Sequence, residues 1–506
     1  MIELEHNEPP GGPRARMMLQ RAHWAAELFA GYDRDRVVRI CDAVAATAFE
    51  HAERFADLAV EETGMGVAEH KRFKNELLSR GLWDHYREHD FVGARYDEDA
   101  KILELPRPAG VIFALTPSTN PIATIYFKVL LVLMTRNAIV VSPHPSARVV
   151  SAEAVRVLSD AAVRAGAPDG CVQVVAEPSI PLIESLMADP TTDVIVATGG
   201  SAVVRAAYRS GNPALGVGPG NVPAFVDASA DLAAAARLII DSKAFDNSIL
   251  CTNESAVIIE ESVAAAFERE LKRHGGYVLD AAEAEQVREH LFPDNRMRLD
   301  LIGKSALVLA EAAGLKVPAT TRVLIVPFTL VVPEEPMARE KLFPVLGLLR
   351  VPNARSGISA AQAMLRITGA GHSASIHSRD ARTIMAYGAA VKVLRVSVNV
   401  GNSLGSAGAQ THLAPTMTIG TGFYGRSSVG ENLEPKHFIN VTRVAYNRDA
   451  GVPFDDFRDL EPWTADPGPA PVVTAATPSV GAAESELIRE EIRKVILEEL
   501  KELTRQ

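Results

Sequence analysis

Short apolar runs alternate with helical stretches in the first half of the chain, and this alternation restricts the fold more than any other feature. The apolar runs are 109–115, 138–142, 172–175 and 193–197. The helical stretches between them are 122–135, 151–165 and 180–187. Units of this kind predict a mostly parallel sheet, and continuously apolar strands predict helices on both of its faces. The predicted fold class is α/β.

The flanking regions are less regular. Residues 17–91 are rich in helix formers and are predicted to be helical. A Gly-rich segment near 216–225 predicts a domain boundary. Beyond it the alternation resumes, with strand-like runs at 256–259, 306–309, 329–333 and 393–398.

The end of the chain has a different composition. Residues 464–483 are rich in Pro, Ala, Gly and Thr, which predicts a flexible linker. Residues 484–506 predict an amphipathic helix whose apolar stripe is Ile488, Ile492, Val495, Ile496, Leu500 and Leu503. Such a helix cannot bury its stripe alone, so it requires a partner.

Composition excludes several classes of protein. Of 506 residues, 47% are hydrophobic and 23% are charged, as in globular proteins. A net charge of −11 argues against a nucleic-acid partner. The three cysteines form no CxxC pair, and the histidines are scattered, so no metal site is expected. The most apolar window, 122–141, contains Lys128 and Arg136, and no secretory signal is visible. We therefore expect a cytoplasmic protein with no membrane partner.

Cys251 lies between a polar segment and an apolar run, at 245–254. This position suits a nucleophile, but a buried core thiol is the commoner state of a lone cysteine. Asp246 and Glu254 are close in sequence, and a nearby negative charge would raise the pKa of the thiol. We therefore expect both carboxylates to point elsewhere.

Three loops follow predicted strands and precede predicted helices. Their candidate ligand-binding residues are Thr116, Pro117 and Asn120 in the first loop, Ser142, Pro143 and His144 in the second, and Thr198, Gly199 and Gly200 in the third. Backbone N–H groups at helix N-termini, with glycines that permit close approach, suit a phosphate or a ribose. The three loops together predict a nucleotide crevice, and the Asn120 amide could donate to an oxyanion.

A series of motifs resembles the aldehyde dehydrogenase superfamily, and most of all its CoA-acylating branch. The motifs, in chain order, are PxGVI, TPSTNP, TRNAIVVSPHP, ATGG, GVGPGN, FDNSILC, EKLFP, GHS and LAPTMTIGTGFYG. The resemblance implies a Rossmann-like cofactor domain at 1–220 with bridging strands near 95–108, and a catalytic domain at 221–410. Residues 411–463 would return to the cofactor domain and supply a bridging strand that builds dimers or tetramers.

The resemblance also implies roles for single residues. Cys251 matches the catalytic cysteine, and the Asn120 amide with the Cys251 N–H would hold the oxyanion. Glu340 matches the glutamate on the nicotinamide ribose, and Gly218 lies in the cofactor segment. Ser142 stands where hydrolytic members often carry a lysine for the adenine ribose, which leaves NAD and NADP both open. His372 would help to deprotonate coenzyme A or would be structural.

The branch is predicted from a missing carboxylate. Hydrolytic members carry a glutamate that activates water, whereas Gly216 stands at that position and no acid lies between Pro213 and Pro223. General-base help is worth roughly 10²–10⁴-fold. We therefore expect transfer of the acyl group from a Cys251 thioester to coenzyme A, with a short aldehyde such as acetaldehyde or propionaldehyde as substrate. A hydrolytic dehydrogenase, an acyl-phosphate reductase and an inactive cargo adaptor remain alternatives.

The C-terminal helix at 484–506 resembles an encapsulation peptide, which directs cargo enzymes into bacterial microcompartments. That resemblance implies a shell or cargo protein as partner and a microcompartment as location. Pairing with another copy of the chain, or docking on the enzyme surface, is the alternative.

Overall fold

The computed structural model describes residues 11–458, 460, 462 and 463. The chain divides into two compact units, 1–464 and 465–506. The predicted linker at 464–483 and the predicted helix at 484–506 lie outside the described residues. All described helices and strands belong to the first unit.

The region predicted to be helical is a series of separate helices. They are α1 (Gly12–Ala30), α2 (Arg34–Glu50), α3 (Ala52–Thr63), α4 (Ala68–Glu76), a π-helical turn (Leu77–Gly81) and α5 (Leu82–Tyr86). Asp33 starts α2, because its carboxylate accepts a hydrogen bond from the N–H of Arg36. Gly64 ends α3 with a φ of 65°, a conformation that glycine adopts without strain.

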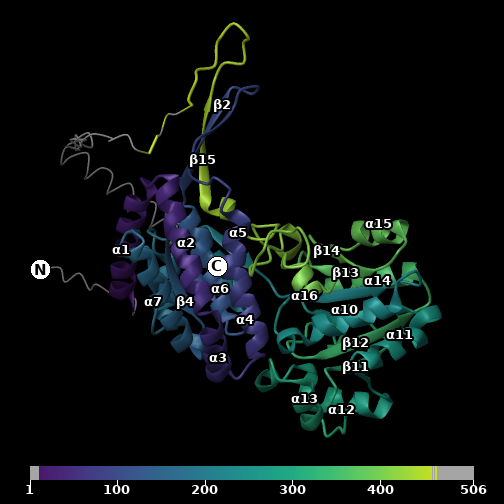
Figure 1. Cartoon of the computed structure of the whole chain (residues 1–506). Coiled ribbons are helices and arrows are strands. Elements are labelled where there is room, and N and C mark those ends of the chain that lie inside the picture. Colours follow the sequence, from purple (N-terminus) through teal and green to yellow (C-terminus); the bar gives the residue numbers. More distant parts are fainter. Residues whose placement is uncertain (1–10, 459, 461, 464–506) are drawn as a thin grey trace, which may run out of the picture. The chain divides into compact units, whose positions relative to one another are not determined.

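A five-stranded parallel sheet forms the core of the first half, with helices on both faces (Figure 1). Its strands are β3 (Val111–Thr116), β4 (Ala138–Pro143), β5 (Val172–Val174), β6 (Val194–Thr198) and β7 (Ala214–Val217). Its helices are α6 (Pro121–Met134), α7 (Arg148–Arg164), α8 (Ile180–Ala188) and α9 (Ser201–Arg209). From β3 the chain adds β4 and β5 on one side of the sheet and then β6 and β7 on the other side. The resulting spatial order is β5-β4-β3-β6-β7, so the direction in which strands are added changes between β3 and β6. In sheets of this kind, ligands bind at the carboxyl ends of the strands beside such a reversal.

A seven-stranded parallel sheet, in the order β10-β11-β12-β9-β8-β13-β14, forms the core of the second half. Its strands are β8 (Val222–Val226), β9 (Glu254–Glu260), β10 (Gly276–Val278), β11 (Val323–Phe328), β12 (Val345–Val351), β13 (Ala374–His377) and β14 (Val396–Val398). Its helices are α10 (Leu232–Ala244), α11 (Glu261–Arg273), α12 (Ala281–Leu291), α13 (Ala306–Ala312), α14 (Ala354–Ile367), α15 (Ala381–Ala390) and α16 (Asn402–Gly405). One apolar cluster joins the sheet to α10 and α11, and another joins it to α12, α13, α14 and α15.

A three-stranded antiparallel sheet extends from the first half (Figure 1). It contains β1 (Arg95–Asp97), β2 (Ile102–Pro108) and β15 (Ile439–Ala445), with β2 in the centre. Within this sheet β15 is an edge strand, and most of its residues are exposed. An exposed edge of this kind is a template for pairing with another chain.

The α/β fold class is confirmed, but two predicted strands are wrong. Residues 306–309 belong to the helix α13, which starts where the Ser305 hydroxyl accepts a hydrogen bond from the N–H of Val308. Residues 329–333 form no strand, and Leu330 in that run is 65% exposed. The paired strand is β11, immediately before them. The run at 393–398 becomes a strand only from Val396.

Candidate active site

Cys251 lies in a turn just before β9, and it differs from the other two cysteines. Cys251 is partly exposed, whereas Cys41 and Cys171 are buried. The segment that leads to the turn has left-handed backbone at Asp246, Asn247 and Ser248, with φ values of 49°, 50° and 64°. Left-handed backbone costs non-glycine residues about 1–2 kcal/mol each, so the surroundings must hold this segment in place.

Two charged groups near Cys251 change the pKa of its thiol in opposite directions. Burial and the nearby Glu340 carboxylate raise the pKa of the Cys251 thiol to about 12, and the Arg395 guanidinium opposes this rise. Arg395 is itself buried and donates hydrogen bonds to the carbonyl oxygens of His372, Gly420 and Gly430. The resting form of Cys251 is therefore the protonated thiol.

The side chain of Glu340 contacts the backbone of Gly220 beside Cys251. The N–H of Gly220 donates to Oε1 of Glu340 at 3.2 Å. A Cβ atom at Gly220 would lie 2.0 Å from the carbonyl oxygen of Cys251, so only glycine fits this approach. Burial raises the pKa of Glu340 to about 7, while the Gly220 bond and the charge of Lys243 oppose that rise. The structure thus brings two residues of the resemblance, Cys251 and Glu340, to one place.

The two acidic residues near Cys251 in sequence do point elsewhere, as expected. Asp246 accepts hydrogen bonds from Lys71 and Lys74. Glu254 is fully buried and accepts a hydrogen bond from the N–H of Asn402 at 2.7 Å. Burial raises the pKa of Glu254 to about 6. Among the described residues, the carboxylate that raises the pKa of Cys251 is that of Glu340.

Asn120 directly precedes α6 and is 8% exposed. Its side-chain oxygen Oδ1 accepts a hydrogen bond from Nζ of Lys74. Its side-chain nitrogen Nδ2 donates to Oγ1 of Thr119 at 3.2 Å. One N–H of the amide is therefore left for a further acceptor.

The three candidate loops lie together at the carboxyl ends of β3, β4 and β6. Thr116 and Pro143 are register partners in adjacent strands, and the N–H of His144 donates to the carbonyl oxygen of Thr116 at 3.1 Å. The hydroxyls of Thr116 and Ser142 are buried and have no hydrogen-bond partner among the described residues. Buried hydroxyls normally have a partner, so these two are suited to a polar ligand.

Open space adjoins the same loops. A Cβ atom at Gly199 or Gly200, after β6, or at Gly218, after β7, would meet no atom of the described residues within 4 Å. Thr198 forms a hydrogen bond between its hydroxyl and that of Thr418, at 3.1 Å. Space for close approach and unpartnered hydroxyls together fit the phosphates and ribose of a nucleotide cofactor. Pro117 lies within the turn that follows β3.

The two candidate histidines have different surroundings. Nδ1 of His144 is hydrogen-bonded to the Ser146 hydroxyl at 2.8 Å and caps the short helix that follows. His372 is fully buried, with Nδ1 bonded to the Ser373 hydroxyl at 2.9 Å and Nε2 left without a partner. Burial and the charge of Arg395 lower the pKa of His372 to about 3, so its ring is neutral.

Gly216 is closely packed against α9. A Cβ atom there would lie 2.7 Å from Cγ1 of Val204 and 2.8 Å from Cε2 of Tyr208. The Tyr208 hydroxyl accepts a hydrogen bond from the N–H of Gly216 at 3.0 Å, which holds the ring in this position. A glutamate side chain at 216 would therefore clash unless the side chains of Val204 and Tyr208 moved aside.

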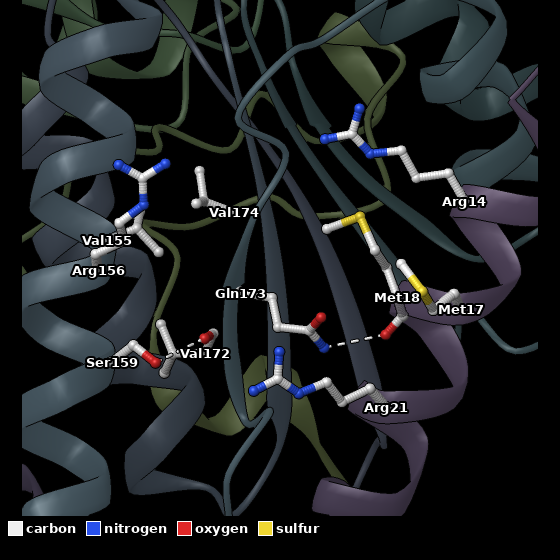
Figure 2. A pocket seen from close by; sticks show the side chains of 10 residues that line it. All are labelled: Arg14, Met17, Met18, Arg21, Val155, Arg156, Ser159, Val172, Gln173 and Val174. Atoms are coloured by element: carbon white, nitrogen blue, oxygen red, sulfur yellow. Dashed lines mark hydrogen bonds between the residues drawn. The ribbon is translucent and has the colours of Figure 1, made fainter.

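A separate cavity of about 410 Å³ lies between α1, α7 and β5 (Figure 2). Arg14, Arg21 and Arg156 surround it, and valine and methionine side chains form much of its wall. Arg21 is paired with Asp169 at 2.6 Å. None of the candidate site residues lines this cavity, so it is separate from the nucleotide loops.

The part of the chain that the structure describes contains neither a candidate metal site nor a candidate membrane-spanning helix. No group of three or more His, Cys, Asp or Glu residues there is placed to hold a metal ion. Across the same residues, no helix is both long enough and apolar enough to cross a membrane.

Sequence reasoning missed three buried cations that shape the site. Lys74 contacts Asn120, Arg395 opposes the rise in the pKa of Cys251, and Lys243 lies near Glu340. Burial lowers the pKa of Lys243 to about 7. No sequence signal distinguishes Lys243, because α10 also contains Arg237 and Asp241, whose side chains are partly exposed.

Two named relatives are similar to this chain over most of its length. The aldehyde-alcohol dehydrogenase of Clostridium acetobutylicum is 37% identical over 431 residues, which are 84% of this chain and 50% of that protein. The chain thus spans half the length of this relative. The succinate-semialdehyde dehydrogenase (acetylating) of Clostridium kluyveri is 36% identical over 442 residues, which are 86% of this chain and 96% of that protein.

Solved structures of several aldehyde dehydrogenases are also similar to this chain. An acetylating aldehyde dehydrogenase from Geobacillus thermoglucosidasius has a TM-score of 0.85 and 37% identity, covering 86% of this chain and 97% of its own. A propionaldehyde dehydrogenase from a fucose utilisation microcompartment of Clostridium phytofermentans has a TM-score of 0.78 and 28% identity, with coverages of 86% and 97%. The Rhodopseudomonas palustris propionaldehyde dehydrogenase with bound propionyl-CoA has a TM-score of 0.77 and 29% identity, with coverages of 86% and 94%.

The sequence pattern of the aldehyde dehydrogenase family matches residues 13–282, more than half of the chain. Together with relatives that align over most of its length, this match identifies the chain as a member of the aldehyde dehydrogenase family.

Proposed function

We propose that the protein is a CoA-acylating aldehyde dehydrogenase that converts a short aldehyde to its acyl-CoA. The observation that carries this proposal is Gly216, where no carboxylate is present and Tyr208 and Val204 fill the space that a side chain would need. The relative from Clostridium kluyveri is named as acetylating, and a solved relative holds propionyl-CoA, which supports the same branch.

In the proposed reaction, the Cys251 thiol gives its proton to solvent water, and the thiolate sulfur adds to the aldehyde carbonyl carbon. The carbonyl oxygen then becomes an oxyanion. The free amide N–H of Asn120 and the backbone N–H of Cys251 stabilise this charge. A bound NAD would supply the acceptor for the hydride of the aldehyde carbon. Loss of that hydride would re-form the carbonyl and leave a thioester on Cys251. The sulfur of coenzyme A would then take the acyl group, and its proton would pass to the released Cys251 thiolate.

We assign the cofactor to the loops at the carboxyl ends of β3, β4 and β6. The unpartnered hydroxyls of Thr116 and Ser142 would bind its polar groups, and Gly199, Gly200 and Gly218 leave room for it. The remaining residues that we assign to cofactor binding lie next to these in the same loops: Pro117, Pro143, His144 and Thr198. Glu340 would bind the nicotinamide ribose beside Cys251. NAD is proposed as the cofactor, and NADP is the comparison in the assay below.

His372 is assigned to the coenzyme A step. Its Nε2 is buried without a partner, and its ring is neutral. A neutral imidazole nitrogen can accept a hydrogen bond from the thiol of coenzyme A and align the sulfur for attack. His372→Ala is expected to slow acyl transfer to coenzyme A more than the formation of the thioester.

The test is formation of reduced cofactor from propionaldehyde, with NAD or NADP, in the presence and absence of coenzyme A. We expect sustained turnover only with coenzyme A, and acyl-CoA as the product. Protein that ends at Trp463 should behave like the full chain in this assay. Sustained production of the free acid without coenzyme A would contradict the proposal and support a hydrolytic enzyme.

We also infer that the domains follow the sheets, with 1–220 binding the cofactor, 221–410 carrying catalysis and 411–463 returning to supply the bridging strand. The exposed edge strand β15 supports assembly into a homodimer or homotetramer through the bridging sheet. Sedimentation of the protein and of a Val441→Pro variant checks this, because proline removes a backbone donor from the strand.

Residues 484–506 are proposed as an encapsulation peptide for a bacterial microcompartment shell or its cargo. Support comes from the apolar stripe of the sequence and from the relative found in a fucose utilisation microcompartment. Fusion of 464–506 to a fluorescent protein is expected to target it to shells. Ile492→Asp/Ile496→Asp should abolish targeting, because each change places a charge in the stripe. Self-association of the fusion without shell binding would contradict this assignment.

A further inference from the structure

A cluster of buried charges connects the loop of Asn120 to the segment that precedes Cys251. Lys71, Lys74 and Asp246 are 3%, 2% and 0% exposed. Nζ of Lys74 donates to Oδ2 of Asp246 and to Oδ1 of Asn120. Nζ of Lys71 donates to the carbonyl oxygen of Thr119 at 2.9 Å and to Oδ2 of Asp246 at 3.3 Å. Helix α4 therefore holds both proposed reacting loops through two lysine side chains.

Asp246 is fixed from several directions. Its Oδ1 accepts a hydrogen bond from the N–H of Val67 at 2.6 Å, and its own N–H donates to Nδ1 of His70 at 2.9 Å. Burial would raise the pKa of Asp246, but the charges of Lys74 and Lys71 hold it below its ordinary value. The carboxylate is therefore ionised and keeps Lys74 in place. These contacts also hold the left-handed backbone at Asp246.

The contact from Lys74 determines which way the Asn120 amide faces. An ammonium group only donates hydrogen bonds, so the amide must present its oxygen to Lys74. A reversed amide would direct its N–H groups at the ammonium and leave both sets of donors unsatisfied. With Oδ1 held by Lys74, Nδ2 faces away from it, and only one N–H of Nδ2 is used, on Thr119.

We propose that Lys74 is a positioning residue, which orients the Asn120 amide so that its free N–H points to the oxyanion, and that Asp246 anchors Lys74 for this task. The inference rests on the proposed function, in which Asn120 stabilises that oxyanion. Loss of one oxyanion-hole donor typically costs about 10²–10³ in kcat. A donor that is present but free to rotate should cost less, about 10- to 100-fold.

The matched variants are Lys74→Met and Lys71→Met. Both remove one charge from the same helix and one hydrogen bond from Asp246, but only Lys74 contacts the Asn120 side chain. We expect Lys74→Met to lower kcat about 10- to 100-fold with little change in the KM for propionaldehyde, because the lost interaction forms only with the oxyanion. Lys71→Met should cost severalfold less. Equal losses in the two variants would overturn the inference.

The decisive measurement is a double-mutant cycle with Asn120→Ala. If Lys74 acts through the amide, Lys74→Met adds no further loss of kcat once the amide is gone. A full, additive loss in the Asn120→Ala background would show that Lys74 acts in some other way and would overturn the inference. If Lys74→Met does not fold, Lys74→Gln takes its place in the same cycle, with melting temperatures measured for every variant.

The assay separates failure of this inference from failure of the proposed function. The unchanged protein and Asn120→Ala are measured first, for coenzyme A dependence and for the burst of NADH from one turnover without coenzyme A. Absence of coenzyme A-dependent turnover in the unchanged protein contradicts the proposed function. Normal coenzyme A-dependent turnover, a loss in Asn120→Ala and no loss in Lys74→Met contradict the role of Lys74 alone.

Discussion

At the carboxyl ends of β6 and β7, a Cβ atom added at Gly199, Gly200 or Gly218 meets no atom of the described residues within 4 Å, whereas at Gly220 it would lie 2.0 Å from the carbonyl oxygen of Cys251. The first region has unpartnered hydroxyls and open space. Around Cys251, backbone segments touch and the nearby charges are buried. The open region suits a large ligand that enters and leaves, and the packed region suits atoms that must stay fixed during a reaction.

The largest expected effect is that of Cys251→Ser, which tests whether the packed region contains the nucleophile. Serine keeps the shape of the side chain but is a far weaker nucleophile without an adjacent base. We expect kcat to fall by about 10³-fold or more, while NAD binding at the open loops stays within about twofold. Turnover assays and NAD titration measure the two quantities. Retained turnover would contradict the assignment and would favour a different nucleophile, whereas absence of turnover in the unchanged protein as well would favour the inactive adaptor.

Gly220→Ala and Gly218→Ala change glycines that are two residues apart. The first lies in the packed region and the second in the open region, so the pair compares the two. At Gly220 the new methyl group must displace the Cys251 backbone, and overpacking of this kind costs about 1–3 kcal/mol. We expect a lower melting temperature and a loss of about tenfold or more in kcat, since small displacements of reacting groups slow catalysis strongly. Gly218→Ala has open space around it and should keep the melting temperature while raising the KM for NAD.

The opposite pattern in this pair would contradict the distinction between open and packed regions. A stable, active Gly220→Ala variant would mean that the backbone around Cys251 can move at little cost in stability. Thermal melting and steady-state kinetics on both variants, with the unchanged protein as reference, are sufficient to decide.

Gly216→Glu restores the residue type that hydrolytic members carry. Because Val204 and Tyr208 occupy the space beside Gly216, we expect a loss of stability of about 1–3 kcal/mol and no gain in acid formation without coenzyme A. Thermal melting and product analysis measure the two outcomes. Adding Tyr208→Ala makes room for the new side chain and should recover part of the stability. A fast, stable hydrolase from Gly216→Glu alone would contradict the packing argument.

The first half of the fold is predictable from sequence because its signals are local. The strands β3 and β4 differ by at most two residues from the predicted runs 109–115 and 138–142. They are apolar throughout, since helices cover both faces. In the second half, 306–309 has the same apolar character, but the Ser305 cap makes it a helix. Short apolar runs do not distinguish a strand from a buried helix without such a cap.

The site is predictable only in part. The family motifs point to Cys251, Asn120 and Glu340, but no local pattern reveals the contacts of Lys74. Its partners lie 46 residues away at Asn120 and 172 residues away at Asp246. A lysine in a helix normally faces water, and only the folded chain shows that this one is 2% exposed. Sequence therefore identifies the reacting groups, and tertiary structure identifies what orients them.

The smallest expected effect concerns how Glu340 tunes the thiol. The Glu340 carboxylate raises the pKa of Cys251, and its own pKa is about 7. At pH 8 the carboxylate is ionised, so Glu340→Gln should lower the pKa of the thiol and speed alkylation by iodoacetamide. We expect about a three- to tenfold gain, one pKa unit being a factor of ten. At pH 6 Glu340 is protonated and neutral, so the two proteins should react at similar rates.

Cys251→Ser provides the background for this measurement, because Cys41 and Cys171 are buried and their pKa values are raised. A gain that persists unchanged at pH 6 would mean that Glu340→Gln loosens the packing around Cys251 and does not act through charge. A gain confined to pH values above 7 is the expected signature of the carboxylate. The Glu340 carboxylate, which raises the pKa of the Cys251 thiol, would then also bind the cofactor ribose. Its side chain would thus contact both the packed region around Cys251 and the cofactor in the open region.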